Sequence, residues 1–173
     1  GNGGPATAAS VGDVVDVAVN PAGEIFVGGR DSHTIRRISG GTIDAIAGPG
    51  TPASNAGIAG FADGTGDIAR FSQTTEMVFH NGALYVVDAR NNRIRLILPA
   101  ATAAATTVQT VAGNGPDMVA PTGVALSTQT GSTNGVAAAP DGSVYIGDRD
   151  GHRVWRRASD GSMSVVAGTG QYR

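Results

Sequence analysis

Short apolar runs of roughly four to eight residues alternate with turn sequences along nearly the whole chain. The segment 14–48 holds four such runs, at about 14–19, 24–28, 33–38 and 42–47. Val, Ile, Phe and Thr are frequent in them, and these residue types favour strands. The turns between the runs carry Pro, Gly, Asn or Asp, which supply the backbone angles of tight hairpins. The pattern therefore predicts a four-stranded antiparallel sheet.

The same unit occurs three times, at about 14–48, 75–113 and 134–168. A four-stranded sheet repeated in tandem is typical of a β-propeller, in which each blade covers the faces of its neighbours. The sequence predicts an all-β fold: one domain, 1–173, with three four-stranded antiparallel blades joined by the linkers 49–74 and 114–133. Equivalent positions fall in step along the three units: Phe26, Tyr85 and Tyr145; Gly29, Asp88 and Asp148; His33, Asn92 and His152.

Three stretches of the chain resemble the NHL repeat. They are Asp63-Gly64-Thr65-Gly66-Asp67-Ile68-Ala69-Arg70-Phe71, the strand 83–88 and the segment 91–97. The resemblance covers nearly the whole chain, although Gly29 replaces the family's aspartate and 114–133 lacks the first motif. NHL propellers usually close with six blades, so the resemblance implies half a ring. The remaining blades would come from the same chain, from further copies or from other subunits.

Composition narrows the possible chemistry. The 173 residues carry a net charge of −2, contain no cysteine, and take all twelve cations from arginine. Without cysteine there is no thiol nucleophile, disulfide or Cys-ligated zinc. No apolar run approaches the ~18 residues of a membrane span, and the charge balance does not favour nucleic acid. We expect no cofactor and no membrane insertion; the compartment stays open, with an extracellular or periplasmic/luminal location slightly preferred.

Two repeat positions carry residues that could be mistaken for a catalytic or metal site. Histidines could ligate zinc, as in the NHL-fold amidating lyase, which the chain resembles in fold; Asp88 and Asp148 could be paired acids or calcium ligands. However, His80 lies at the opposite blade end from the other two histidines, and the paired positions recur with the repeat. We interpret them as structural turn residues, the aspartates bonding the backbone N–H groups of their own turns. The prediction is no catalytic residue and no metal, with these turn positions: His33, Asp88, Asn92, Asp148 and His152.

One end of the blades is the candidate binding face. The loop from the second to the third strand emerges there beside the long linkers, and long loops on a rigid scaffold often carry function. Arginines elsewhere on the third strands are expected to be solvated and locally salt-bridged, and Trp155 to be partly buried against the adjoining blade. The face alternates positive and negative residues, which suits a protein or glycan partner: Arg30, Asp31, Arg90, Asn91, Arg149 and Asp150.

The leading functional hypothesis is a non-catalytic scaffold for protein or glycan interaction, within a secreted or cell-surface assembly. The alternative is a lyase- or lactonase-like propeller enzyme with a metal in its channel. The first strands offer only Asp16 and Glu76 as carboxylates for such a metal. A second alternative is single-stranded RNA binding, which needs a basic face with stacking aromatics; aromatics are only 5% of the chain.

Overall fold

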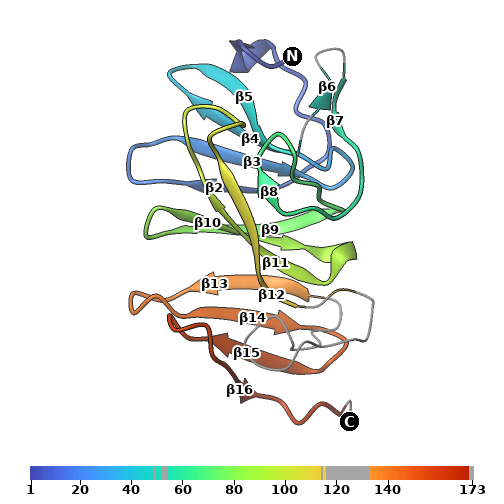
Figure 1. The fold of residues 1–173 in the computed structure, drawn as a ribbon, viewed down its shortest axis with the longest axis vertical. Coiled ribbons are helices and arrows are strands. Elements are labelled where there is room, and N and C mark those ends of the chain that lie inside the picture. Colours follow the sequence, from blue (N-terminus) through green and yellow to red (C-terminus); the bar gives the residue numbers. More distant parts are fainter. Residues whose placement is uncertain (49, 52–53, 114, 116–132, 172–173) are drawn as a thin grey trace.

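The computed structural model of the protein describes residues 1–48, 50–51, 54–113, 115 and 133–171, with the side chains of 50–51 and 54–56 left aside. These residues form three antiparallel sheets that stack face to face along the long axis of the molecule (Figure 1). The fold is all-β, and the three sheets are propeller blades. The predicted linker 114–133 lies almost entirely outside the described residues.

Each blade follows the order of the sequence from an inner to an outer strand. Neighbouring strands within each blade pair antiparallel, and a register shift interrupts the pairing near the start of each inner strand. The strands of the three blades are β2 (Val14–Val19), β3 (Ile25–Gly29), β4 (Ile35–Ser39) and β5 (Thr42–Ala47); β9 (Thr74–His80), β10 (Ala83–Asp88), β11 (Arg93–Leu98) and β12 (Thr107–Ala112); and β13 (Thr133–Ala138), β14 (Val144–Asp148), β15 (Arg153–Arg157) and β16 (Met163–Ala167).

Short linker strands add a fifth member to the first two blades. β1 (Gly4–Pro5) pairs with β5, and β8 (Gly64–Thr65) pairs with β12. These strands cover the outer edges, which would otherwise expose unpaired backbone groups. The sequence pattern did not predict them, because two residues are too few to show strand periodicity. The remaining short elements are η1 (Ala6–Ala8), β6 (Gly50–Thr51), β7 (Ser54–Gly57) and η2 (Ala89–Asn91).

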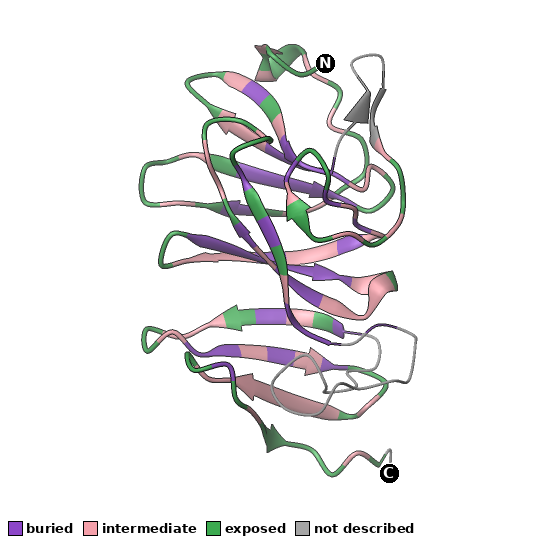
Figure 2. Cartoon of the chain, viewed as in Figure 1, coloured by how far each residue is buried: buried purple, intermediate pink, exposed green. Residues whose placement is uncertain are grey.

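The core lies between the sheets rather than inside any one of them. One apolar cluster joins the first and second blades, and includes Phe26, which stacks on Phe79 with ring centroids 5.5 Å apart. A second cluster joins the second and third blades. β10 is sandwiched between both clusters and is buried along its whole length (Figure 2). Blade-on-blade burial explains why its apolar residues run continuously instead of alternating.

Candidate functional site

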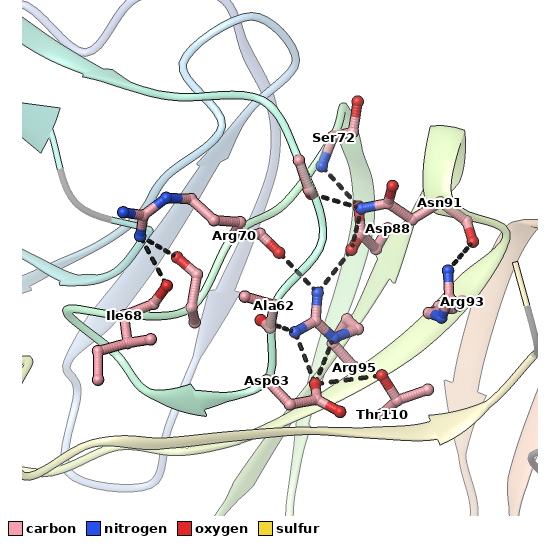
Figure 3. Close-up of polar contacts among 12 residues, drawn as sticks. Ala62, Asp63, Ile68, Arg70, Ser72, Asp88, Asn91, Arg93, Arg95 and Thr110 are labelled. Atoms are coloured by element: carbon pink, nitrogen blue, oxygen red, sulfur yellow. Dashed lines mark hydrogen bonds and ion pairs between the residues drawn. The ribbon is translucent and has the colours of Figure 1, made fainter.

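A buried arginine ties the linker of the second blade to its sheet. Arg95 on β11 has no exposed side-chain surface and donates five hydrogen bonds to linker or blade acceptors (Figure 3). Its Nη1 reaches Asp88 Oδ2 at 2.7 Å, and its Nη2 reaches Asp63 Oδ1 at 2.7 Å. The other acceptors are the carbonyl oxygens of Arg70 and Ala62. The planar fork of a guanidinium suits this convergent set of oxygens.

Asp88 is the buried anion of this network. Its Oδ1 accepts the backbone N–H of Ser72 from the linker, at 2.7 Å, and its Oδ2 also accepts from the Asn91 side chain. Burial raises the pKa of Asp88, whereas the bonds from Asn91, Ser72 and Arg95 oppose that shift. The carboxylate makes no capping bond to its own turn, η2. That expectation was therefore wrong for Asp88, because Arg95 and the linker occupy its oxygens.

The small and apolar residues of the 63–71 motif fit the same linker into the fold. A Cβ on Gly66 would lie 2.0 Å from the carbonyl oxygen of Ile46, so only glycine passes between the first blade and the second. Ala69 and Phe71 are completely buried in the core between these blades. The motif therefore positions a linker, with its glycine, alanine and phenylalanine set by packing.

The position of Arg95 is occupied by Arg36 in the first blade and by Trp155 in the third, and these two residues make different contacts. Arg36 in the first blade is 3% exposed and donates to Asn2 Oδ1 and to the carbonyl oxygens of Ser10 and Gly1. Burial lowers its pKa, with the charge of Asp44 opposing. The expectation that these third-strand arginines are solvated was wrong for Arg36 and Arg95. Both are buried because they hold N-terminal linker segments against their blades.

The third blade has a tryptophan where the others have arginine. Trp155 is half-buried, packs against the core between the second and third blades, and donates from its indole nitrogen to Asp148 Oδ2 at 3.1 Å. The other oxygen of Asp148 accepts the backbone N–H of Gly151, within its own turn.

The repeat position of His33, Asn92 and His152 has left-handed backbone angles in every blade, with φ of 52°, 49° and 47°. Asparagine and histidine tolerate this region better than most residues. In addition, His33 Nδ1 accepts the backbone N–H of Gln73, across the first blade junction. His80 lies at the far end of its blade, beside a groove of about 710 Å³ between the β2–β3 and β9–β10 turns.

The predicted binding face lies where the β3–β4 turn, η2 and the β14–β15 turn emerge, at one end of the three sheets (Figure 1). Its charged residues are exposed, and Arg149 forms a loose pair with Asp150 at 3.9 Å. Asn91 is different from the rest, because its amide nitrogen is bound by Asp88 and by the carbonyl oxygen of Gly60. The exposed members of the face are Arg30, Asp31, Arg90, Arg149 and Asp150.

The two carboxylates of the inner strands bind the next blade. Asp16 Oδ2 accepts the backbone N–H of Met77 at 2.6 Å, and Glu76 Oε2 accepts the backbone N–H of Val136 at 3.1 Å. Each carboxylate is therefore engaged across a blade junction. In the described part of the chain, no group of three or more His, Asp or Glu residues is arranged to hold a metal ion. Nor is any helix of that part long and apolar enough for a membrane crossing.

Sequence reasoning did not find Asp63, Arg36 and Arg95 as a linker-anchoring set, nor the bonds of Asp16 and Glu76. Nothing in the sequence marked the arginines as buried. Each follows an apolar strand residue, Ile35 or Ile94, that is fully buried, and alternation along a strand then predicts a solvated arginine. The inter-blade carboxylates were not marked either, because their partners are backbone groups.

No protein-family model and no curated protein sequence matches the chain. Several solved structures are similar to it in fold. An auxiliary nutrient binding protein from Bacteroides ovatus is 16% identical, with a TM-score of 0.61, over 90% of this chain and 36% of that one. Virginiamycin B lyase from Staphylococcus aureus is 15% identical, with a TM-score of 0.57, over 94% and 44%. A chain of a nidogen/laminin complex is 13% identical, with a TM-score of 0.57, over 90% and 48%.

The chain thus spans less than half the length of each of these three structures. Their similarity shows the propeller fold. These three proteins differ in kind: one is a binding protein, one is an enzyme and one is a member of a protein complex. Function has to be argued from the residues of this chain.

Proposed function

We propose that the chain is part of an NHL-type β-propeller that acts as a non-catalytic binding scaffold. The NHL assignment is supported by the roles of the 63–71 motif: Asp63 binds Arg95, Gly66 passes the Ile46 carbonyl, and Phe71 fills the core. The residues of the 63–71 motif therefore anchor a linker to its blade, and they do not form a catalytic site.

One observation carries the scaffold proposal. The two inner-strand carboxylates, Asp16 and Glu76, both accept backbone N–H groups of the following blade. An enzyme with a channel metal would need such groups to converge on the axis as ligands. Their engagement favours a structural use of the inner strands, and it leaves the exposed turns as the place for binding.

The exposed face at the second-to-third-strand turns is the proposed contact surface. Arg30, Arg90 and Arg149 occur once per blade, so they present the same cation at regular intervals along that face. Asp31 and Asp150 stand beside two of them. Planar guanidinium groups bind carboxylates and sulfates with two hydrogen bonds each. The face therefore suits an acidic protein segment or an acidic glycan.

Binding of the purified chain to a microarray of acidic glycans and acidic peptides tests this proposal. A variant with Arg30→Gln, Arg90→Gln and Arg149→Gln should bind at least about tenfold more weakly, since three exposed ion pairs contribute roughly 1.5 kcal/mol together. The matched control is Ala22→Glu, Pro140→Glu and Ser159→Glu, which changes the charge equally at the opposite end. Equal loss in both variants, or one equivalent of bound metal without array binding, would contradict the proposal.

A further inference from the structure

The two blade junctions use the same inner-strand contact. At the first, Asp16 Oδ2 accepts the N–H of Met77; at the second, Glu76 Oε2 accepts the N–H of Val136. The acceptors are equivalent, since each stands one residue before the equivalent positions Val17 and Met77. The first and second blades therefore each offer a carboxylate to the blade that follows, and the second and third blades each receive one.

In the first blade, the backbone N–H equivalent to those of Met77 and Val136 belongs to Val17, and no preceding blade covers this residue in the structure. Val17 is 54% exposed, whereas its equivalents Met77 and Val136 are 6% and 7% exposed under a preceding blade. The N–H of Val17 is bound only locally, by Asp16 Oδ1 of the neighbouring residue at 2.8 Å. Val14 and Val19 on the same strand are also exposed, at 40% and 57%. Together these residues form an apolar strip, the Val14–Val19 face, with a receptive N–H near its centre.

We propose that the Val14–Val19 face docks against a further four-stranded blade whose inner strand carries Asp or Glu at the position of Asp16 and Glu76. Burial of the three valines would supply the apolar contact, in the way that Met77 and Val136 are covered now. The carboxylate would accept the Val17 N–H and fix the register of the two strands. The inference stands apart from the proposed binding scaffold, because it concerns the blade junction and not the exposed turns.

A second copy of this chain is a poor fit for the same face. Its third blade would be the one presented to Val17, and that blade has Gly135 at the carboxylate position. Glycine offers no side-chain acceptor, so the junction would lack the bond that both observed junctions contain. The partner is therefore a blade distinct from the third one.

The outer edge sets one more requirement on this partner. Ala6 follows β1 in the first blade as Gly66 follows β8 in the second, and their N–H groups bind the equivalent carbonyls of Gly41 and Thr106. A Cβ at Gly66 would lie 2.0 Å from the Ile46 carbonyl oxygen. The preceding blade must therefore stand further from Ala6 at its outer strand, while its inner strand approaches Val17.

An extended chain provides the direct test. Residues 57–112 are placed before Gly1, so that a copy of the second blade, with its glutamate, precedes the first blade of the complete chain. The fusion point keeps the three residues that follow Ala112, because Gly113-Asn114-Gly115 and Gly1-Asn2-Gly3 have the same sequence. We expect amide hydrogen exchange at Val17 to slow at least about tenfold relative to the parent chain. Glu76→Ala in the added copy alone should restore most of the lost exchange rate.

Two results would overturn the proposal. One is unchanged exchange at Val17 in an extended chain that folds, or equal protection with and without the added glutamate. The other is a parent chain that dimerises in sedimentation velocity and protects Val17, because a second copy would then be the occupant.

A variant of the parent chain keeps the proposal testable if the extended chain does not fold. Gly135→Asp installs a carboxylate at the equivalent position of the third blade, where a Cβ meets nothing closer than Glu76 Oε2 at 3.4 Å. We expect its head-to-tail self-association to be at least about tenfold tighter than that of the size control Gly135→Ala. Equal association of the two variants would contradict the role given to the carboxylate.

Discussion

The second and third blades place an aspartate at the same repeat position and use it differently. Asp88 and Asp148 are both buried, at 0% and 3% exposure. Asp88 binds the linker amide of Ser72 and the guanidinium of Arg95. Asp148 binds the amide of Gly151 in its own turn and the indole of Trp155.

The difference follows from the residue seven positions later. Arginine has five N–H donors and can bridge the aspartate to several linker oxygens at once, whereas tryptophan has a single donor. Arg95 therefore converts a turn aspartate into an anchor for a distant segment, and Trp155 leaves it local. The repeat therefore determines where the aspartate lies, and the residue seven positions later determines which groups the aspartate binds.

The largest expected effect is the loss of this anchor. Arg95→Ala leaves the Asp88 carboxylate buried without its cation, and it removes the guanidinium bonds to the carbonyl oxygens of Ala62 and Arg70. We expect the free energy of unfolding to fall by about 3–5 kcal/mol, measured by urea denaturation. Asp88→Asn combined with Arg95→Met should be less destabilising than Arg95→Ala, because no buried charge is left unpaired; Asp63, which also loses its cation, is exposed.

The third blade provides the control for that result. Trp155→Phe removes the bond to Asp148 Oδ2 and keeps an aromatic ring against the core, so we expect a loss of about 1 kcal/mol. Equal losses for Arg95→Ala and Trp155→Phe would show that the two blades do not differ in the way the contacts indicate.

A smaller effect is expected from the glycine in the anchored linker. Gly66→Ala forces a Cβ toward the carbonyl oxygens of Ile46 and Ala103, at 2.0 and 2.9 Å. Overpacking of this kind destabilises by about 1–3 kcal/mol, which thermal unfolding would detect. The matched change is Ala6→Gly at the equivalent place in the first blade, where we expect no more than about 1 kcal/mol. A tolerated Gly66→Ala would mean that the linker moves freely between the blades.

The sequence predicted what is periodic in this fold and missed what is not. The strands of the first blade, expected at about 14–19, 24–28, 33–38 and 42–47, lie within two residues of β2 to β5. Repetition revealed them, because apolar strands and hairpin turns recur at nearly fixed spacing.

The anchoring contacts were harder to predict because they join residues far apart in the chain. Arg95 meets Asp63 across 32 positions, and Asp16 meets Met77 across 61. Arginine on a strand is normally solvated, so its type alone favours the wrong interpretation. Only the path of the linker over the blade shows that Arg36 and Arg95 are buried.

The smallest expected effect concerns two turn aspartates of the third blade, which accept hydrogen bonds only two residues away in the chain. Hydrogen bonds from the Ser143 backbone N–H and side chain lower the pKa of Asp141 from its usual 3.8, and Ser162 does the same for Asp160. A carboxyl group whose pKa is depressed on folding stabilises the protein above its unfolded pKa, and this contribution is lost as the pH falls through the folded value. The double variant Asp141→Asn with Asp160→Asn keeps an accepting oxygen at each turn, but these side chains cannot be protonated. Its acid limb, the loss of stability as the pH falls below about 4, should therefore be slightly shallower than that of the parent protein. Melting temperatures between pH 5 and pH 3 would measure this.

Asp88 is unchanged in both proteins, so its opposite pKa shift cancels in the difference between them. An acid limb as steep as the parent's would place the titrating groups elsewhere, and it would remove these turns from the contrast between local and long-range aspartates.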